Sequence, residues 1–346
     1  MPETDPTTAK KSETVLVTGG GGFLGSAIVK RLVERGGKVR SFSRNFYPKL
    51  EAMGVEQIQG DIADRKAVEH ACQDVALVLH VAAKPGVWGH YDEYHRTNVN
   101  GTENVIAACQ NCNVSRLVYT SSPSVVFDGK NNAGVDESAP YALKFQAHYP
   151  KTKALAEQKV LRAASGRLST IILRPHLIWG PEDNHLVPRI IARAKKLRRI
   201  GKGRNLVDTT YIDNAAEAHI LAADKLEENQ KLSGNKYFIS QDEPIPVWDM
   251  INAILNAAGL APVKGSVPKN MAWLTGALLE FIYKIFKISA EPPLTRFVVD
   301  ELTSPHWFDI SAAKKDLGYI PKISTQEGLR RLEKWLSHEN NPGGRK

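Results

Sequence analysis

The sequence predicts a doubly wound α/β fold of the Rossmann type, followed by a smaller, mostly helical C-terminal part. Three observations indicate this fold. Short apolar runs alternate with amphipathic segments through the first half, a glycine-rich turn follows the first run, and the rhythm changes after Pro181. Parallel strands give such runs because helices cover both faces of their sheet.

The individual elements follow from the same patterns. The first strand is expected at Val15-Leu16-Val17. Further strands are expected at 38–43, 55–59, 75–81, 116–121, 170–173 and 236–240. Helical spacing of apolar residues predicts helices over 65–72, 94–112 and 149–164. This order brings the carboxyl ends of the strands to one edge, where ligands of such sheets bind.

Composition limits the class of protein. The chain has 346 residues, 42% of them hydrophobic, and a net charge of +9. The positive charge suits nucleic acid, an anionic membrane surface or an anionic ligand. No nucleic-acid partner is predicted, because no helix-turn-helix, zinc-finger or RNA-binding pattern occurs. Three cysteines favour a reducing compartment, and the pair Cys109 and Cys112 has no second pair, so no metal site is predicted.

The two ends of the chain are predicted to be flexible. Residues 1–12 are polar and lack the apolar core of a signal peptide, so they are interpreted as an arm of a cytoplasmic protein. Residues 339–346 are interpreted as a tail.

A dinucleotide site is expected at the turn after the first strand. The segment Thr18 to Gly25 reads TGGGGFLG, with Gly19, Gly22 and Gly25 three residues apart and Phe23 and Leu24 opening the next helix. Such glycines allow a tight turn, a close approach of the backbone to a pyrophosphate, and packing of helix on sheet. The free N–H groups and the dipole of the helix start favour the phosphates.

The second strand discriminates between the two nicotinamide cofactors. An acidic residue at its end would bind the ribose 2′-OH and repel a 2′-phosphate, but this chain has Ser43 and Arg44. NADP(H) is therefore preferred over NAD(H), which stays possible because both residues could be solvated loop residues. Further contacts are expected after later strands, from Asp61 and Ile62 to the adenine and from the small Ala82 and Ala83 to the cofactor.

A proton-transfer site is expected from a tyrosine and a lysine. Tyr149 and Lys153 lie four residues apart on one helix face. The pKa of a phenol is usually near 10, and a nearby ammonium, together with the positive nicotinamide of the oxidised cofactor, favours the phenolate. Tyr149 is then the general acid in reduction and the general base in oxidation, and both residues are expected at the cofactor, with Lys153 reaching the nicotinamide ribose. Ser122, after the fifth strand, would orient a substrate carbonyl, with Ser121 and Ser124 as rivals. The chain leaves the sheet at Pro175.

The residues after Pro175 are expected to meet the nicotinamide amide. His176 is the first of them, and it could equally be a packing histidine.

Together these motifs resemble the extended short-chain dehydrogenase/reductase superfamily. TGGGGFLG, GDIAD, HVAA, NVNGT, YTSS, YPKTK and LRPHLIWGP occur in the family's order between about residues 14 and 220. The resemblance implies catalytic roles for Ser122, Tyr149 and Lys153. It places Thr18 to Gly25, Asp61 and Pro175 at the cofactor, and it implies a homodimer built through the helices at 94–112 and 149–164.

Within that superfamily the chain resembles the 3β-hydroxysteroid dehydrogenase-like branch. The segments 205–218 and 291–307 look most like those of bacterial 2-alkyl-3-oxoalkanoate reductases of olefin biosynthesis. The implied reaction is reduction of the 3-oxo group of a long-chain 2-alkyl-3-oxo acid by NADPH. Residues 13–180 would hold the cofactor, with elements near 205–240 returning to that domain, and 181–204 with 241–338 would bind substrate.

The C-terminal part favours an apolar substrate. Residues 271–288 (MAWLTGALLEFIYKIFKI) suit an amphipathic helix that covers an apolar pocket, lies on a membrane, or simply packs on the core. Peripheral association with a membrane or with another enzyme of a pathway is therefore expected as a possibility. The basic run from Arg189 to Arg204 could attract anions or form a solvated helix face.

Three other functions remain open at this point. A 3β-hydroxysteroid or sterol dehydrogenase working with NAD shares the chemistry, but Ser43 and Arg44 argue against NAD. A sugar-nucleotide epimerase or dehydratase shares the cofactor motifs, but the apolar C-terminal segment argues against it. A non-catalytic protein that senses NADP would not need both Tyr149 and Lys153.

Overall fold

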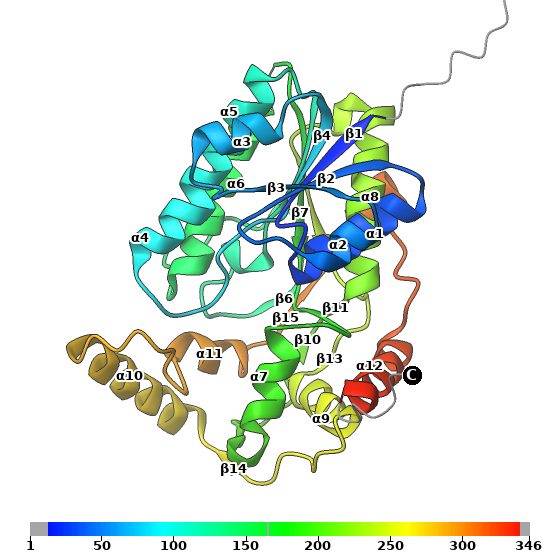
Figure 1. The fold of residues 1–346 in the computed structure, drawn as a ribbon. Helices are drawn as coiled ribbons and strands as arrows, with labels where there is room; N and C mark the ends of the chain where they lie inside the picture. The colour runs from blue at the N-terminus through cyan, green and yellow to red at the C-terminus, as the bar shows by residue number, and fades with distance from the viewer. Residues whose placement is uncertain (1–12, 165, 340–346) are drawn as a thin grey trace, which may run out of the picture.

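The computed structural model describes residues 13–339 apart from residue 165, so the predicted N-terminal arm and residues 340–346 lie outside the described part. A parallel seven-stranded sheet forms its centre (Figure 1). In spatial order the strands are β12 (Asn235–Ile239), β7 (Ser169–Pro175), β5 (Arg116–Thr120), β4 (Val75–His80), β1 (Thr14–Thr18), β2 (Lys38–Ser43) and β3 (Glu56–Gln59). Each lies within two residues of a predicted strand, and the doubly wound Rossmann fold is confirmed.

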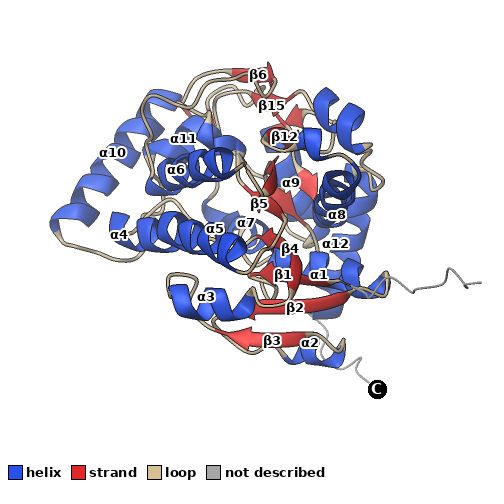
Figure 2. Cartoon of the chain, turned by 90° about the horizontal axis from the view of Figure 1, so that it is seen from above, coloured by secondary structure: helices blue, strands red, loops and turns tan. Residues whose placement is uncertain are grey.

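Alternation along the strands produces two apolar layers. Leu16 belongs to the apolar cluster on one face of the sheet, and its neighbour Val17 belongs to the cluster on the other face. Val78 and Leu79 divide in the same way. Figure 2 shows the sheet between the two layers. On one side lie α1 (Phe23–Glu34) and α8 (Ile212–Glu228); on the other lie α3 (Arg65–Ala71), α5 (Gly101–Asn111) and α6 (His148–Ala163).

The helix predicted over 94–112 is divided in the structure. It consists of α4 (Tyr91–Tyr94), a π-helical turn η1 (His95–Asn100) and α5. Asn98 explains the change of pitch, because its amide side chain accepts from the Lys84 N–H at 2.7 Å and donates to Thr152 at 3.0 Å. The wider turn thus presents this side chain to both the loop after β4 and the helix α6.

A smaller part lies beyond the carboxyl ends of the main strands (Figure 1). A four-stranded sheet there has the order β13 (Ile245–Pro246), β10 (Leu206–Val207), β15 (His306–Phe308) and β6 (Asn132–Val135). The strand β6 comes from the first half of the chain and pairs with β15 near the end. The helices of this part are α7 (Leu186–Arg193), α9 (Val247–Ala257), α10 (Lys269–Ile285), α11 (Arg296–Glu301) and α12 (Thr325–Glu339).

Short elements complete the architecture. The helix α2 (Pro48–Ala52) follows β2, and two small sheets pair β8 (Ile178–Trp179) with β11 (Thr210–Tyr211) and β9 (Arg199–Ile200) with β14 (Ser266–Val267). Helix α12 runs to Glu339, the first residue of the predicted tail. The amphipathic helix expected over 271–288 is α10, which begins two residues earlier and ends at Ile285. None of the helices in the described residues is long and apolar enough to cross a membrane.

Candidate active site

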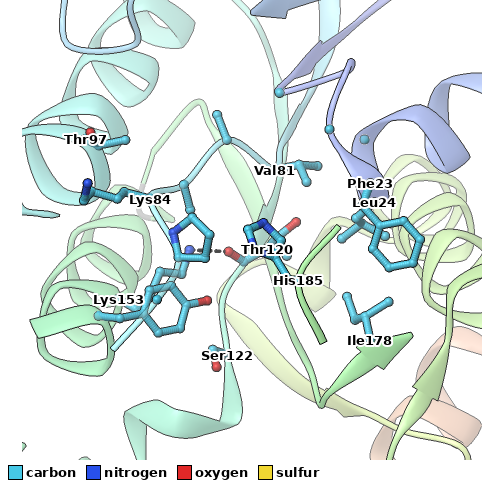
Figure 3. Close-up of a pocket in the computed structure, with 18 of the residues that line it drawn as sticks. Phe23, Leu24, Val81, Lys84, Thr97, Thr120, Ser122, Lys153, Ile178 and His185 are labelled. Carbon is cyan, nitrogen blue, oxygen red and sulfur yellow. Dashed lines mark hydrogen bonds between the residues drawn. The ribbon is translucent and has the colours of Figure 1, made fainter. Parts of the chain in front are cut away.

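A cleft of about 960 Å³ opens where the carboxyl ends of the central strands meet the smaller part. Its walls come from the loops after β1, β2, β3, β4, β5 and β7 on one side, and from α11 and β15 on the other. Figure 3 shows Thr120, Ser122 and Lys153 on one side of this cleft, with Phe23 and Leu24 across from them. The predicted cofactor and catalytic residues therefore converge on one site, with one exception described below.

The glycine loop has the geometry expected of a phosphate-binding turn. Gly19 has a φ of +71° and donates its N–H to the Phe42 carbonyl at 2.8 Å. A Cβ on Gly25 would lie 2.1 Å from the Gly19 carbonyl oxygen, so a side chain cannot be accommodated there. These two glycines hold α1 close against the end of β1.

The start of α1 suits the pyrophosphate of a dinucleotide. Gly22 is the N-terminal cap, no side chain accepts the first N–H groups of this helix, and its first turn contains no acidic residue. Gly22, Phe23 and Leu24 line the cleft. An uncapped helix start facing a cleft supplies N–H donors and a positive dipole to an anion, so the residues present fit NAD(P).

Thr18 is the exception. It is fully buried and does not line the cleft. Its hydroxyl accepts the N–H groups of Val81 and Ala82 at 3.1 and 3.2 Å and bonds to His80 at 2.7 Å. Thr18 therefore fixes the loop after β4 against β1 instead of contacting a cofactor. The reason is that β1 continues through Thr18 and turns only at Gly19.

Ser43, Arg44, Asp61 and Ile62 line the end of the cleft where the adenosine is predicted to bind. Asp61 accepts from the Ala63 N–H at 2.9 Å and from Arg96 at 2.8 Å. The backbone hydrogen bond from Ala63, followed by the pairing with Arg96, lowers the pKa of Asp61. Arg96 was not predicted, and a single arginine in a helix gives no sequence signal. The adenine contact of Asp61 stays a prediction.

The small residues after β4 lie against the glycine loop. A Cβ on Gly19 would approach the Cα of Ala82 to 3.0 Å, so the two loops are in close contact. Ala82 and Ala83 line the cleft, as do Pro175 and His176 after β7. These positions agree with the predicted cofactor contacts.

Lys153 is held under the substrate position by the end of β5. Its Nζ donates to the Thr120 carbonyl at 2.5 Å and lies 4.2 Å from the centre of the Tyr119 ring. Burial lowers the pKa of Lys153 to about 7, and the Glu157 carboxylate works in the opposite direction. The lysine can therefore gain and lose a proton near neutral pH.

The expected lowering of the Tyr149 pKa is not found. Burial raises the pKa of this phenol to about 12, and a hydrogen bond with the Ser122 side chain offsets only part of the rise. The Lys153 ammonium is turned to the Thr120 carbonyl, to which its Nζ donates a hydrogen bond. Tyr149 is thus protonated at neutral pH, which suits donation of a proton to a carbonyl oxygen.

The three serines after β5 have different roles. Ser121, a predicted rival, donates its hydroxyl to the buried Glu157 carboxylate and is engaged there. Ser124 bonds to the Ser122 hydroxyl at 2.9 Å. Ser122 lines the cleft and hydrogen-bonds with Tyr149, so it has the position predicted for the residue that orients the carbonyl.

A buried ion pair supports this side of the site. Glu157 and Arg174 are almost fully buried and pair directly, and Tyr141 donates to Glu157 at 2.8 Å. Glu157 lies one turn after Lys153 on α6. Removing one member of such a pair leaves an uncompensated charge in the interior, so the pair fixes the position of α6 under the cleft.

The part of the cleft lined by α11 and β15 is aromatic and is the candidate substrate half. Phe127 lies 6.0 Å from Phe297 and 5.7 Å from His306, measured between ring centres. His176 lies 5.0 Å from both His306 and Phe308. All five rings line the cleft. His176 thus packs within this wall, and burial keeps it neutral by lowering its pKa well below the usual value. Sequence reasoning missed the other four rings.

Two charged residues from the smaller part also reach the cleft. Arg189 on α7 pairs with Glu291, and Glu301 on α11 lines the same region. Burial raises the pKa of Glu301 to about 7, and the nearby positive charge of Arg189 offsets part of this rise. No group of three or more metal-ligating side chains occurs within the described residues.

Comparison with known proteins places this site in a family. The model of the 3-beta hydroxysteroid dehydrogenase/isomerase family matches residues 16–268. A 2-alkyl-3-oxoalkanoate reductase of Stenotrophomonas maltophilia is 50% identical over 92% of this chain and 98% of its own length. The decarboxylating sterol-4-alpha-carboxylate 3-dehydrogenase of Mus musculus is 34% identical over 95% of this chain and 92% of its own length.

Solved structures show the same architecture. MoeE5 in complex with UDP-glucose and NAD superimposes with a TM-score of 0.73 and 25% identity, covering 94% of this chain and 99% of that protein. The fold, the cleft and the family match agree with one another. The chain therefore belongs to the 3-beta hydroxysteroid dehydrogenase/isomerase family, within the extended short-chain dehydrogenases/reductases, and is an NAD(P)-dependent oxidoreductase of carbonyl–alcohol pairs.

Proposed function

We propose that the protein uses NADPH to reduce the 3-oxo group of a long-chain 2-alkyl-3-oxoalkanoate to the 3-hydroxy acid, a step of olefin biosynthesis. The observation that carries this proposal is the aromatic wall of the cleft that Tyr149 also lines, formed by Phe127, Phe297 and Phe308 with two neutral histidines. Such a wall gains from burying alkyl chains. The 50% identity to a 2-alkyl-3-oxoalkanoate reductase supports the same substrate class.

The side chains of the site can perform a reduction. NADPH held at Gly22 and Leu24 by the start of α1 would supply the hydride for the carbonyl carbon. Tyr149, protonated up to about pH 12 in this cleft, donates its proton to the carbonyl oxygen, and Ser122 hydrogen-bonds to that oxygen. Lys153, with its pKa of about 7, returns a proton toward the phenolate after turnover. Arg44 at the adenosine end offers a charged donor to a 2′-phosphate.

A second candidate is a sterol dehydrogenase working with NAD. The 34% identity to the mouse sterol-4-alpha-carboxylate 3-dehydrogenase favours it, and a rigid sterol could also lie against the aromatic wall. Arg44, in the place of an acidic residue after β2, favours NADP(H) and therefore argues against this candidate.

The direct test measures substrate and cofactor together. A racemic 2-alkyl-3-oxo acid, a 3-ketosteroid and a UDP-sugar are each incubated with NADPH and, separately, with NADH. We expect kcat/KM for the 2-alkyl-3-oxo acid with NADPH to exceed that of every other combination by about a hundredfold. Faster turnover of the ketosteroid would overturn the proposal, as would epimerisation of the UDP-sugar in a parallel incubation with NAD⁺, which accepts a hydride from the sugar and returns it without net consumption.

A further inference from the structure

The outward face of α10 exposes a continuous apolar stripe. Eight of the twelve large hydrophobic side chains that are exposed in the described residues lie within 271–288. Five of them repeat at intervals of three and four residues and so share one helix face, each 57–64% exposed: Met271, Leu274, Leu278, Phe281 and Ile285. The opposite face packs inward through Ala272, Gly276 and Glu280. A surface of this kind marks an interaction site.

The charges around the stripe are positive. The only acidic residue within 269–288 is Glu280, which is buried and accepts from the N–H and the Nε of Arg296 at 2.7 and 2.8 Å. Lys284 and Lys287 are exposed at the C-terminal end of the helix. Lys151 on α6 adds a further positive charge near this end of α10. Burial lowers the pKa of His148, and the positive charges of Lys151 and Lys284 lower it further.

The helix is attached to two walls of the cleft. Gly276 allows close contact with α11, because a Cβ there would lie 3.0 Å from the Arg296 backbone nitrogen. After the C-terminal end of α10, the Ile288 carbonyl accepts from the Trp88 indole at 3.2 Å, and the Trp88 and Tyr283 ring centres lie 6.1 Å apart. Trp88 directly follows the cleft-lining segment 81–87, and α11 contributes Phe297 and Glu301. Figure 1 shows α10 at the edge of the smaller part, beside α11.

We propose that the stripe of α10 inserts into the interface of an anionic lipid membrane and places the mouth of the cleft beside that membrane. An apolar helix face with lysines and no outward carboxylate matches such a surface, and the lysines add electrostatic attraction to acidic headgroups. A second copy of the chain matches less well, because two such faces would present lysines to each other without a carboxylate. The inference rests on the proposed function in one respect: an alkyl substrate would enter the cleft from the lipid.

The test is flotation of the full-length protein, loaded with NADPH, with lipid vesicles. Anionic vesicles contain phosphatidylcholine and phosphatidylglycerol, and neutral vesicles contain phosphatidylcholine alone. We expect binding to the anionic vesicles. The double variant Leu278→Ser/Phe281→Ser should bind at least about tenfold more weakly, because it loses two inserted side chains. Ile320→Ser removes an equally exposed apolar side chain outside the stripe and should bind like the unmodified protein.

The lysines are tested separately. Lys284→Gln/Lys287→Gln should weaken binding to anionic vesicles by about tenfold or more and leave the weak binding to neutral vesicles unchanged. NADPH binding and turnover of a short, water-soluble 3-oxo acid should be the same in all variants, which shows that each one is folded.

Two results would overturn the inference. One is the absence of binding to either kind of vesicle. The other is a particle mass that falls from two chains to one in Leu278→Ser/Phe281→Ser, since this would show that a second copy covers the stripe. A dimer built through the helices at 91–111 and 148–163 would keep its mass in that variant. Vesicle binding without turnover of the 2-alkyl-3-oxo acid would contradict the proposed function but not the membrane surface.

Discussion

The cofactor half of the cleft is assembled from the ends of successive parallel strands, whereas the substrate half draws on segments far apart in the chain. Gly19, Ser43, Asp61 and Ala82 each lie at the end of a strand of the central sheet or within two residues after it. In contrast, the aromatic wall joins Phe127 to Phe297 and His306, across about half of the sequence. The first half is therefore set by backbone geometry, and the second by side-chain packing between segments distant in the sequence.

This difference predicts that the two halves respond differently to substitution. Changes in the cofactor half should be severe and independent of the substrate, because little space is left around the backbone. Changes in the substrate half should be graded and should depend on the length of the alkyl chains. The predictions below run from the largest expected effect to the smallest.

Gly25→Val should reduce NADPH affinity by about a hundredfold or more. The new side chain would displace the Gly19 carbonyl, which lies 2.1 Å from the position of a Cβ at Gly25, and so would open the phosphate turn. Fluorescence titration with NADPH measures the effect. Ser26→Ala, one residue further along α1, removes only a hydroxyl bonded to the Phe23 carbonyl and serves as the control. Unchanged affinity in Gly25→Val would show that the phosphates bind elsewhere.

The rate of reduction should fall by about tenfold per pH unit above about pH 7. Burial lowers the pKa of Lys153 to about 7, so its ammonium is present below that pH and is lost above it. Tyr149, with a pKa of about 12, stays protonated over the same range. The profile of kcat against pH measures this, because Lys153 returns its proton after the chemical step, and Lys153→Met, which has no ionisable side chain, should be slow and lack the descending limb. A profile of the unmodified protein that is flat to about pH 9 would contradict the role of the Lys153 ammonium.

Arg44→Ala should reduce the preference for NADPH over NADH by about tenfold, because one charged hydrogen bond to the 2′-phosphate is lost. The ratio of kcat/KM for the two cofactors gives the effect. Arg65→Ala changes an exposed arginine that does not line the cleft, and should leave the ratio unchanged. A preference for NADH in the unmodified protein would remove this assignment.

Phe297→Leu should have the smallest effect, an increase of about fivefold in KM for long-chain substrates with little change for short ones. The ring packs on Phe127 in the aromatic wall, and leucine keeps part of that contact. Leu143→Ala, at a fully exposed position, is the control. An equal change for long and short substrates would mean that the wall does not contact the alkyl chains.

The sequence predicts the cofactor half of the site better than the substrate half. The strands, the glycine turn, Arg44, and the pair Tyr149 and Lys153 were predictable because each depends on spacing within a single segment. The wall was not, because the pairing of β6 with β15 leaves no local pattern. The rise of the Tyr149 pKa could not be predicted for a related reason. The spacing of Tyr149 and Lys153 places them together, but only the structure shows that the lysine turns to Thr120 and that burial dominates.

The same limit applies to Thr18 and Asn98. Both belong to motifs of the cofactor domain, yet both act by tying loops together: Thr18 binds the backbone after β4, and Asn98 joins that loop to α6. A motif identifies such residues without showing whether they contact a ligand, because that depends on where the strand ends and on the pitch of the helix.

The most direct test of the account compares the unmodified protein with Tyr149→Phe, each loaded with NADPH and mixed with a 2-alkyl-3-oxo acid in a single turnover. The variant retains the ring but has no proton to donate, so we predict the same NADPH affinity and a loss of about a thousandfold in the rate of NADPH oxidation. Oxidation by the variant at the unmodified rate would contradict the account.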